Sequence, residues 1–290
     1  MAANLGILYG IAAALAFSIA AVFYKKGFTG KQPDILFASG LRAFPTFLLL
    51  LLVNLVLKED IGVVFNENVM LFAFLSLFTA LVIGDTFFFL ALKITPLSIV
   101  YPISYSFSLF ASIFSFIFLN ESITVFLMLS ILVLVLGIFL VYSDREKGEV
   151  KLEARGIFYS FITAVFWGLS VIFTKIGLNY ATPLILNLTR ISMLTLIALP
   201  YLAYKRDQIK GYRKGLGYIV IGGFLGIGIG PVLFFFSIIN IGASRASILA
   251  SGAPLLSLIM ASIFLREKIK RKQLIGILLV ILSVYLVYLS

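Results

Sequence analysis

Residues 6–27 read GILYGIAAALAFSIAAVFYKKG, an apolar stretch long enough to cross a lipid bilayer as a helix. Residues 156–177 read GIFYSFITAVFWGLSVIFTKIG and resemble the first stretch from end to end. The identical positions include two glycines, a tyrosine and a lysine, paired as Gly6/Gly156, Tyr9/Tyr159, Lys25/Lys175 and Gly27/Gly177. The chain therefore contains two similar segments about 150 residues apart.

The similarity extends to the end of each half. The segment IFLNESI at 117–123 returns as IFLREKI at 263–269, and LVY at 140–142 returns at 286–288. Apolar helices match easily by chance, so polar pairs carry more weight. These pairs are Glu121/Glu267, Arg42/Arg190 and Ser98/Ser244. The sequence thus predicts an internal duplication.

Composition places the chain in a bilayer. Of 290 residues, 62% are hydrophobic and only 12% are charged, too little polar surface to cover a soluble globule. The mean hydropathy is +1.15. Spanning helices are predicted near residues 4–24, 34–57, 69–92, 97–119, 124–142, 155–174, 184–204, 215–238, 243–265 and 272–289.

These ten segments form two groups of five. We expect a first five-helix repeat over 1–142, a linker over 143–153 and a second repeat over 154–290. A unit with an odd number of crossings inserts its second copy upside down, which is typical of secondary transporters. The predicted fold is an all-α polytopic membrane protein with ten transmembrane helices arranged as two inverted repeats.

The positive charge is distributed unevenly between the two sides. In a soluble protein a net charge of +11 would suggest nucleic acid, but here one side holds only Lys58, Lys175 and Arg245, and the other holds eighteen basic residues. The positive-inside rule makes the crowded side cytoplasmic. We expect a multi-pass cell-membrane protein with both termini outside, contacting lipid and a small-molecule substrate but not nucleic acid, as a monomer or a homodimer.

The chain has no cysteine and no histidine. This removes thiolate and imidazole metal sites, haem and disulfides, so we expect no metal and no cofactor. The run GIGIGP at 226–231 lacks the strand and acidic residue of a dinucleotide site, and no ATP-binding motif is present. An enzyme is therefore not expected.

Several motifs together resemble the EamA-type permeases of the drug/metabolite transporter superfamily. They are the two FL-x-E-x-I helix ends at Glu121 and Glu267, Pro254 in the ninth span, Arg42 and Arg190 in the second span of each half, and GDTFFFLALKIT at 84–95. The resemblance covers essentially the whole chain. It implies export or exchange of small organic metabolites, often amino acids, through a central cavity between the halves.

Ionisable residues inside the bilayer are costly and usually functional. Arg42 lies about eight residues, or roughly 12 Å of helical rise, into its span, and Asp85 lies at nearly the same depth on the next. We expect them to pair, either to fix packing or close the cytoplasmic side, or to bind substrate or a coupling proton.

Arg190 lies at the mirrored depth, but Pro231 replaces the matching carboxylate. Its partner is then either Glu121, at the outer end of the fourth span, or a substrate anion such as a carboxylate. Glu121 and Glu267 are expected to be helix-end and gate residues, with substrate contact as the alternative.

Hydroxyl and aromatic side chains lie near the middle of the predicted spans. Trp167, the only tryptophan, is too deep for an interfacial anchor. Polar stripes at helical spacing are Tyr101, Ser104, Tyr105 and Ser108 on the fourth span and Ser244, Ser247 and Ser251 on the ninth. The predicted substrate-cavity residues are Tyr9, Thr79, Tyr101, Ser104, Tyr105, Ser108, Tyr159, Trp167, Ser170, Asn187, Ser247 and Ser251. For the serines, interhelical hydrogen bonding is the alternative.

The predicted function is alternating-access transport of a small organic metabolite, most plausibly amino acids, driven by a gradient. Sugars, nucleotide-linked metabolites and drugs remain alternative solutes. A channel would need charge rings or carbonyl filters, and a membrane-embedded enzyme would need a second mid-span carboxylate besides Asp85.

Overall fold

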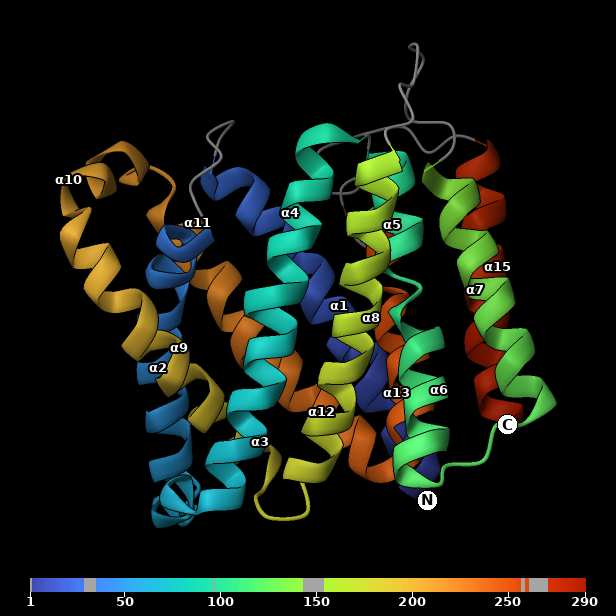
Figure 1. Ribbon diagram of the computed structural model, residues 1–290, viewed down its shortest axis with the longest axis horizontal. Coiled ribbons are helices and arrows are strands. Elements are labelled where there is room, and N and C mark those ends of the chain that lie inside the picture. The colour runs from blue at the N-terminus through green and yellow to red at the C-terminus, as the bar shows by residue number, and fades with distance from the viewer. Residues whose placement is uncertain (1, 29–34, 96, 143–153, 257–258, 261–270) are drawn as a thin grey trace.

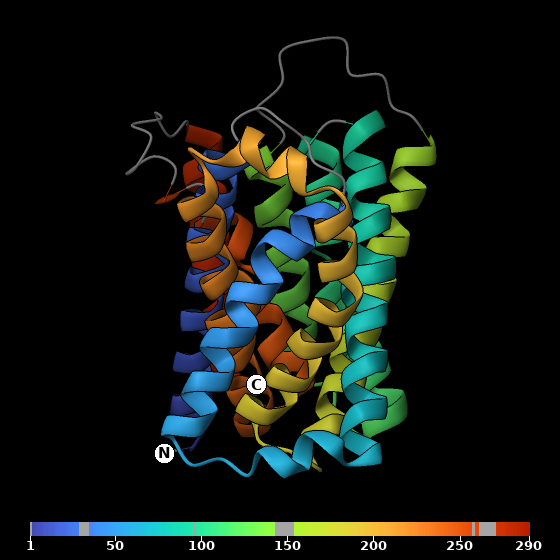
Figure 2. The same ribbon diagram turned by 90° about the vertical axis from the view of Figure 1, so that its left-hand side faces the viewer.

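The computed structural model describes residues 2–28, 35–95, 97–142, 154–256, 259–260 and 271–290 of the protein. Within these ranges all regular structure is helical and there are no strands. The helices run side by side in one bundle, roughly parallel or antiparallel to one another (Figures 1 and 2). Glu267 lies outside the described residues.

The helices follow the order of the apolar segments. In the first half they are α1 (Ala2–Phe28), α2 (Ile35–Val56), the 3-10 helix η1 (Ile61–Phe65), α3 (Glu67–Leu77), the π-helix η2 (Phe78–Gly84), α4 (Asp85–Ile94), α5 (Leu97–Ser104), α6 (Phe107–Leu119) and α7 (Val125–Tyr142). In the second half they are α8 (Ala154–Gly177), α9 (Pro183–Tyr204), α10 (Arg206–Ile209), the 3-10 helix η3 (Lys210–Tyr212), α11 (Leu216–Gly223), the π-helix η4 (Phe224–Ile229), α12 (Gly230–Ile241), α13 (Ala243–Ser251) and α15 (Arg271–Leu289).

Seven segments among the described residues are long and apolar enough to cross a membrane. They are Ala3–Phe28, Leu36–Val56, Glu67–Ala91, Ala154–Gly177, Pro183–Tyr204, Leu216–Ile241 and Arg271–Leu289. Two shorter apolar helices, Phe107–Leu119 and Val125–Leu140, lie over two more predicted spans. The all-helical, multi-pass character is therefore present, whereas the count of ten stays a prediction.

Large apolar side chains cover much of the outside of the bundle. Leu132 is 65% exposed, Leu196 74% and Leu278 57%. In water such a surface would be a liability, but it suits contact with lipid tails. Many polar side chains, such as Ser108 and Asn187, are instead buried inside the bundle.

Polar residues end the helices where the apolar segments stop. Thr182 caps α9 by accepting a hydrogen bond from Ile185 N (3.3 Å), and Pro183 occupies the first turn, where its missing N–H costs nothing. Asn120 ends α6 in the left-handed conformation, with φ 54°. These residues fix the points at which the chain turns back into the bundle.

The third and eighth predicted spans each contain a π-helix. The first, η2, joins α3 to α4, and the second, η4, joins α11 to α12. Phe78 and Phe224, which start them, are 146 residues apart, the spacing that also relates Glu121 to Glu267. π-helices are rare and frequently mark functional sites.

The fourth predicted span is not one continuous helix. The helix ends at Ser104 and restarts at Phe107, and the hydroxyl of Ser106 donates to Ile103 O (2.6 Å) across the break. The predicted stripe from Tyr101 to Ser108 is therefore divided between α5 and α6, a correction to the sequence analysis. A turn at Gly252 ends α13 at the corresponding position.

Contacts between the halves hold the bundle together. The helix α2 packs along α9, α7 along α15, α1 along α12, and α8 against α3, α4 and α6. Two buried hydroxyls reach across these contacts, from Ser18 to Ala253 O and from Ser237 to Gly6 O, each at 2.8 Å. Such bonds stabilise helix pairs in lipid by about 1 kcal/mol each.

Both termini lie at the same end of the bundle, as Figures 1 and 2 show. The helix α10 and the basic segment around it lie at the opposite end (Figure 1). This segment carries Lys205, Arg206, Lys210, Arg213 and Lys214. The basic end and the end with the termini are thus separated by the length of the bundle.

Candidate functional site

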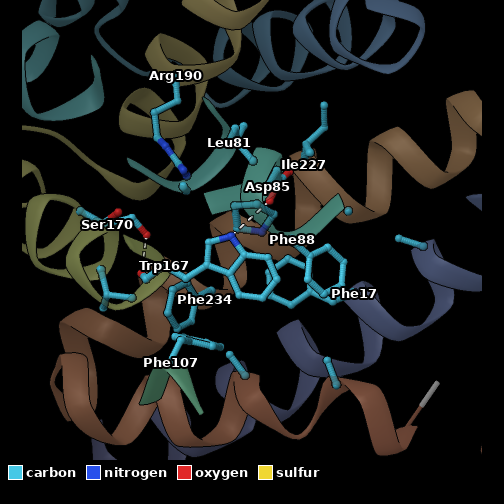
Figure 3. Close-up of a pocket in the computed structure, with 18 of the residues that line it drawn as sticks. Phe17, Leu81, Asp85, Phe88, Phe107, Trp167, Ser170, Arg190, Ile227 and Phe234 are labelled. Atoms are coloured by element: carbon cyan, nitrogen blue, oxygen red, sulfur yellow. Dashed lines mark hydrogen bonds between the residues drawn. The ribbon is translucent and has the colours of Figure 1, made fainter. Parts of the chain in front are cut away.

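A cavity of about 340 Å³ lies between the two halves of the chain. Most of its wall is apolar, and aromatic rings from α1, α4, α8 and α12 face it (Figure 3). Its polar lining residues are Tyr24, Arg42, Asp85, Tyr105, Trp167, Ser170, Thr174, Asn187 and Arg190. A small apolar pocket with a few polar groups is the usual form of a small-molecule site.

The two halves contribute lining residues in pairs. On α1 and α8 the pairs are 150 residues apart: Phe17/Trp167, Ala20/Ser170, Ala21/Val171 and Tyr24/Thr174. Around the π-helices they are 146 apart: Ala80/Gly226, Leu81/Ile227, Asp85/Pro231, Phe88/Phe234 and Phe89/Phe235. Arg42 and Arg190 form one further pair. The same spacings relate the repeated sequence motifs.

Arg42 and Asp85 form the ion pair expected from the sequence. The Nη2 atom of Arg42 lies 3.9 Å from Oδ2 of Asp85, and its guanidinium lies over the Tyr24 ring at 5.3 Å. The indole Nε1 of Trp167 donates to Oδ1 of Asp85 at 3.2 Å (Figure 3). The carboxylate thus has a partner on each oxygen.

Gly84 makes the contact between Trp167 and Asp85 possible. A Cβ on this residue would lie 2.4 Å from Cδ1 and 2.7 Å from Nε1 of the indole. Its carbonyl also accepts from the hydroxyl of Thr163 at 3.3 Å. The end of η2 and the helix α8 can therefore approach closely only with glycine at this position.

Arg190 has no such carboxylate among the described residues. Its side chain is 8% exposed, lies over the Phe235 ring at 5.2 Å and extends into the pocket (Figure 3). Its Nε has no hydrogen-bond partner in the described part of the chain. The pocket lining consequently carries two guanidinium groups and one carboxylate.

Glu121, one of the two alternatives for the partner of Arg190, is engaged elsewhere. Its carboxylate accepts hydrogen bonds from Ala243 N (2.7 Å), Ser244 N (3.0 Å) and Ser244 Oγ (2.9 Å). It therefore closes the N-terminus of α13, where a negative charge is favoured. Gly242, with φ +87°, brings the chain to this carboxylate.

Asn187 lies one helical turn before Arg190 on α9 and also lines the pocket. Its Nδ2 donates to Ile227 O and Gly228 O of η4, each at 3.0 Å. Pro231 has no N–H to offer Ile227 O four residues earlier, which leaves that carbonyl open to the amide. The Oδ1 of Asn187 has no partner among the described residues.

Four of the predicted cavity residues, Tyr105, Trp167, Ser170 and Asn187, line the pocket, as do Arg42, Asp85 and Arg190. The other predicted cavity residues are not among the lining residues. Tyr101 stacks on Tyr105 at 5.4 Å.

The remaining predicted residues make local contacts away from the lining. Tyr9 and Tyr159 contact Phe236 and Phe87, with ring centroids at 5.3 and 5.6 Å. The hydroxyls of Thr79 and Ser247 donate to the carbonyls four residues earlier, of Leu75 and Ala243. Ser104, Ser108 and Ser251 are buried, with hydroxyls that have no partner among the described residues.

The sequence analysis missed Tyr24, Thr174 and the phenylalanines of the wall. Tyr24 could have been found, because Phe17, Ala20 and Tyr24 follow helical spacing and Thr174 is the duplicate of Tyr24. In the described part of the chain, no group of acidic residues is arranged to hold a metal ion.

Comparison with known families identifies the class of protein to which this chain belongs. The sequence profile of the EamA-like transporter family matches residues 4–143 and 154–289. The chain belongs to this family. A transporter of unknown specificity from Archaeoglobus fulgidus is 26% identical over 98% of both chains.

Two relatives with named substrates match part of the chain. An S-adenosylmethionine/S-adenosylhomocysteine transporter of Chlamydia muridarum is 28% identical over 49% of this chain and 44% of its own. A protein named "probable amino-acid metabolite efflux pump" from Salmonella typhimurium is 27% identical over 44% of this chain and 40% of its own. One crystal structure, 16% identical, covers 98% of this chain and 96% of its own with a TM-score of 0.78, which shows the same fold.

Proposed function

We propose that this EamA-like transporter moves a small organic metabolite, with amino acids as the leading class, by alternating access through the central pocket. The observation that carries the proposal is the paired lining, in which corresponding residues of both halves face one cavity. Sites at the interface of two repeats are typical of secondary transporters. The energy would come from a solute or ion gradient.

The packing supports two inverted five-helix repeats, 1–142 and 154–290. Exchanging the halves turns the contact of α1 with α12 into that of α8 with α4, and the contact of α1 with α13 into that of α8 with α5. The contacts of α2 with α9 and of α7 with α15 pair equivalent helices. A two-fold axis in the membrane plane would produce this pattern.

The charge distribution supports an orientation with both termini outside. The termini share one end of the bundle, and the basic segment around α10 lies at the other (Figure 1). Basic residues mark the cytoplasmic side. Arg42 would then lie toward the cytoplasm and Arg190 toward the outside.

Glu121 is proposed as part of an outer gate. It belongs to the first half and holds the start of α13 in the second through three hydrogen bonds. Glu121, Asn240, Ser244 and Arg245 also line a second, more polar cavity. Opening toward the outside would require these bonds to break.

The pocket favours amino acids over the alternative solutes. Its volume, about 340 Å³, is near the lower end of the roughly 300–1,000 Å³ typical of ligand pockets. The charged groups suit a zwitterion, and a mostly apolar lining offers few hydrogen-bond partners for the hydroxyls of a sugar. The name of the Salmonella relative points the same way, whereas S-adenosylmethionine carries both an amino-acid head and a nucleoside.

Counterflow in proteoliposomes tests the proposal. Vesicles loaded with unlabelled L-leucine, L-methionine or L-phenylalanine should accumulate the labelled amino acid transiently, because a carrier exchanges one solute for another. Protein-free vesicles provide the control. Saturable exchange of other organic solutes but none of these amino acids would reject the amino-acid class, and single-channel conductance would reject the carrier mechanism.

A further inference from the structure

The wall of the pocket formed by α9 carries a hydrogen-bond donor and an acceptor that nothing in the described chain uses. The donor is Nε of Arg190 and the acceptor is Oδ1 of Asn187. Side chains three residues apart lie on the same face of a helix, with Cβ atoms about 5–6 Å apart. Both residues are buried, at 8% and 0% exposure, and both line the cavity.

The orientation of the Asn187 amide follows from its contacts. Two backbone carbonyls, of Ile227 and Gly228, each lie 3.0 Å from Nδ2. A flipped amide would place its oxygen against both carbonyl oxygens, which would repel it. The free atom is therefore the oxygen, and it can only accept a hydrogen bond.

Arg190 supplies the complementary charge. In the described residues it has an aromatic partner, Phe235, but no ion pair, and the only mid-span carboxylate, Asp85, already contacts Arg42 and Trp167. Asp85 attracts Arg190 only from a longer range, and a buried guanidinium without a closely paired anion is costly. The site is therefore complementary to a ligand that carries a carboxylate beside a hydrogen-bond donor.

We infer that Asn187 and Arg190 form the head-group site for an α-amino carboxylate, with the carboxylate on Arg190 and the ammonium group on Asn187 Oδ1. The two groups of such a ligand share one carbon and so fit side chains one turn apart. The side chain of the ligand would lie against Phe17, Phe88 and Phe234. The inference rests on the proposed function and specifies its substrate as an amino acid with an apolar side chain.

Other ligands leave one of these groups unsatisfied. A simple monocarboxylate would use Arg190 but leave the Asn187 oxygen without a donor, and an amine would leave the guanidinium unpaired. An inorganic anion has no apolar group that could contact the phenylalanine wall. Unsatisfied buried groups discriminate strongly between related ligands.

Binding to the purified full-length protein tests the inference. Trp167, the only tryptophan, lines the pocket, so its fluorescence reports occupancy. We expect quenching by L-leucine, L-methionine and L-phenylalanine. Phenylpropanoate, which lacks the amino group, and phenylethylamine, which lacks the carboxylate, should each bind at least about tenfold more weakly than phenylalanine, or about 1.4 kcal/mol.

Two variants test which side chain binds the amino group of the ligand and which binds its carboxylate. Asn187→Leu should weaken phenylalanine at least about tenfold and leave phenylpropanoate within about twofold, because only the amino group uses Oδ1. Arg190→Gln should weaken both carboxylates and spare phenylethylamine. The control is Thr195→Val on the same helix; Thr195 does not line the pocket, and its hydroxyl donates to Ile191 O. This variant should change none of these affinities.

The outcomes separate the inference from the proposed function. Equal binding of phenylalanine and phenylpropanoate by the natural protein, or no binding of the three amino acids, would overturn the head-group site even if neither variant folds. Counterflow of a solute without an amino group would overturn it too while transport stands. Tight amino-acid binding without counterflow would uphold the site and reject transport.

Discussion

At the level of single residues, the two halves of the pocket differ in how their arginines are paired. Arg42 and Arg190 occupy matching positions in the two halves, yet among the described residues only Arg42 has a carboxylate ion-pair partner, and Pro231 stands where the first half has Asp85. One guanidinium is paired within the protein, and we infer that the other binds a ligand. On this inference, the two halves contribute unequally to the ligand site.

Removing the charge of Asp85 should destabilise the protein. Asp85→Asn strands Arg42, and breaking one partner of a buried ion pair costs about 3–5 kcal/mol. The double variant with Arg42→Gln should recover part of this loss, which thermal unfolding in detergent would measure. Equal destabilisation by Asp85→Asn and by Asp60→Asn, at the exposed start of η1, would argue against the pair.

Enlarging Gly84 should displace the indole of Trp167. In Gly84→Ala the new methyl group meets the ring at 2.4 Å, so we expect a shifted fluorescence maximum and weaker amino-acid binding. Gly217→Ala is the matched control, because nothing lies within 4 Å of its Cβ position. An unchanged spectrum in Gly84→Ala would show that the contact with Asp85 does not form.

The sequence predicted the charged residues of the pocket better than its wall. Arg42, Asp85 and Arg190 stand out because charges are rare in spans. The wall phenylalanines do not, because the chain has 29 and those facing lipid look the same. Serines such as Ser108 and Ser251 follow helical spacing, but spacing does not distinguish a cavity from a helix contact.

At the level of elements, interruptions in helices position the site. The π-helices η2 and η4 bring Ala80, Leu81, Gly226 and Ile227 to the pocket, and a break before Phe107 separates α6 from α5. The sequence indicated the spans through hydropathy, but a π-helix has the same apolar composition as the α-helix around it. For η4, the sequence signals were the glycines at 226 and 228 and Pro231 just after it.

Weakening the cap on α13 should open the outer end. In Glu121→Gln the charge that holds Ala243 N and Ser244 N is lost. Because the chain has no natural cysteine, a single Asn240→Cys reports access. We expect labelling by an impermeant maleimide to rise several-fold, but not in Glu67→Gln, an exposed carboxylate on α3. Equal labelling in both would reject the gate.

At the level of the whole molecule, the helices of the two halves pack against each other in corresponding pairs. The pairs α2 with α9 and α7 with α15 join equivalent helices, while α1 and α8 each pack against the other half around the cavity. The duplicated motifs predicted that the halves are related, through polar pairs such as Arg42/Arg190 and Ser98/Ser244. The interlocking of the halves needed coordinates, since sequence spacing does not state which helices meet.

The orientation can be tested with single cysteines at the two ends. Asn4→Cys on α1 and Gln208→Cys on α10 are both exposed and lie at opposite ends of the bundle. Intact cells should label Asn4→Cys from outside and Gln208→Cys only after permeabilisation. The reverse pattern would invert the orientation, and labelling of both in intact cells would place the two ends on one side.

The most direct test of alternating access uses one residue of the pocket. Ser170→Cys introduces a single thiol among the lining residues. An impermeant maleimide should label it from either side of oriented vesicles, and L-phenylalanine should protect it from both. Labelling from one side only, under all substrate conditions, would contradict a pocket that opens alternately to each face of the membrane.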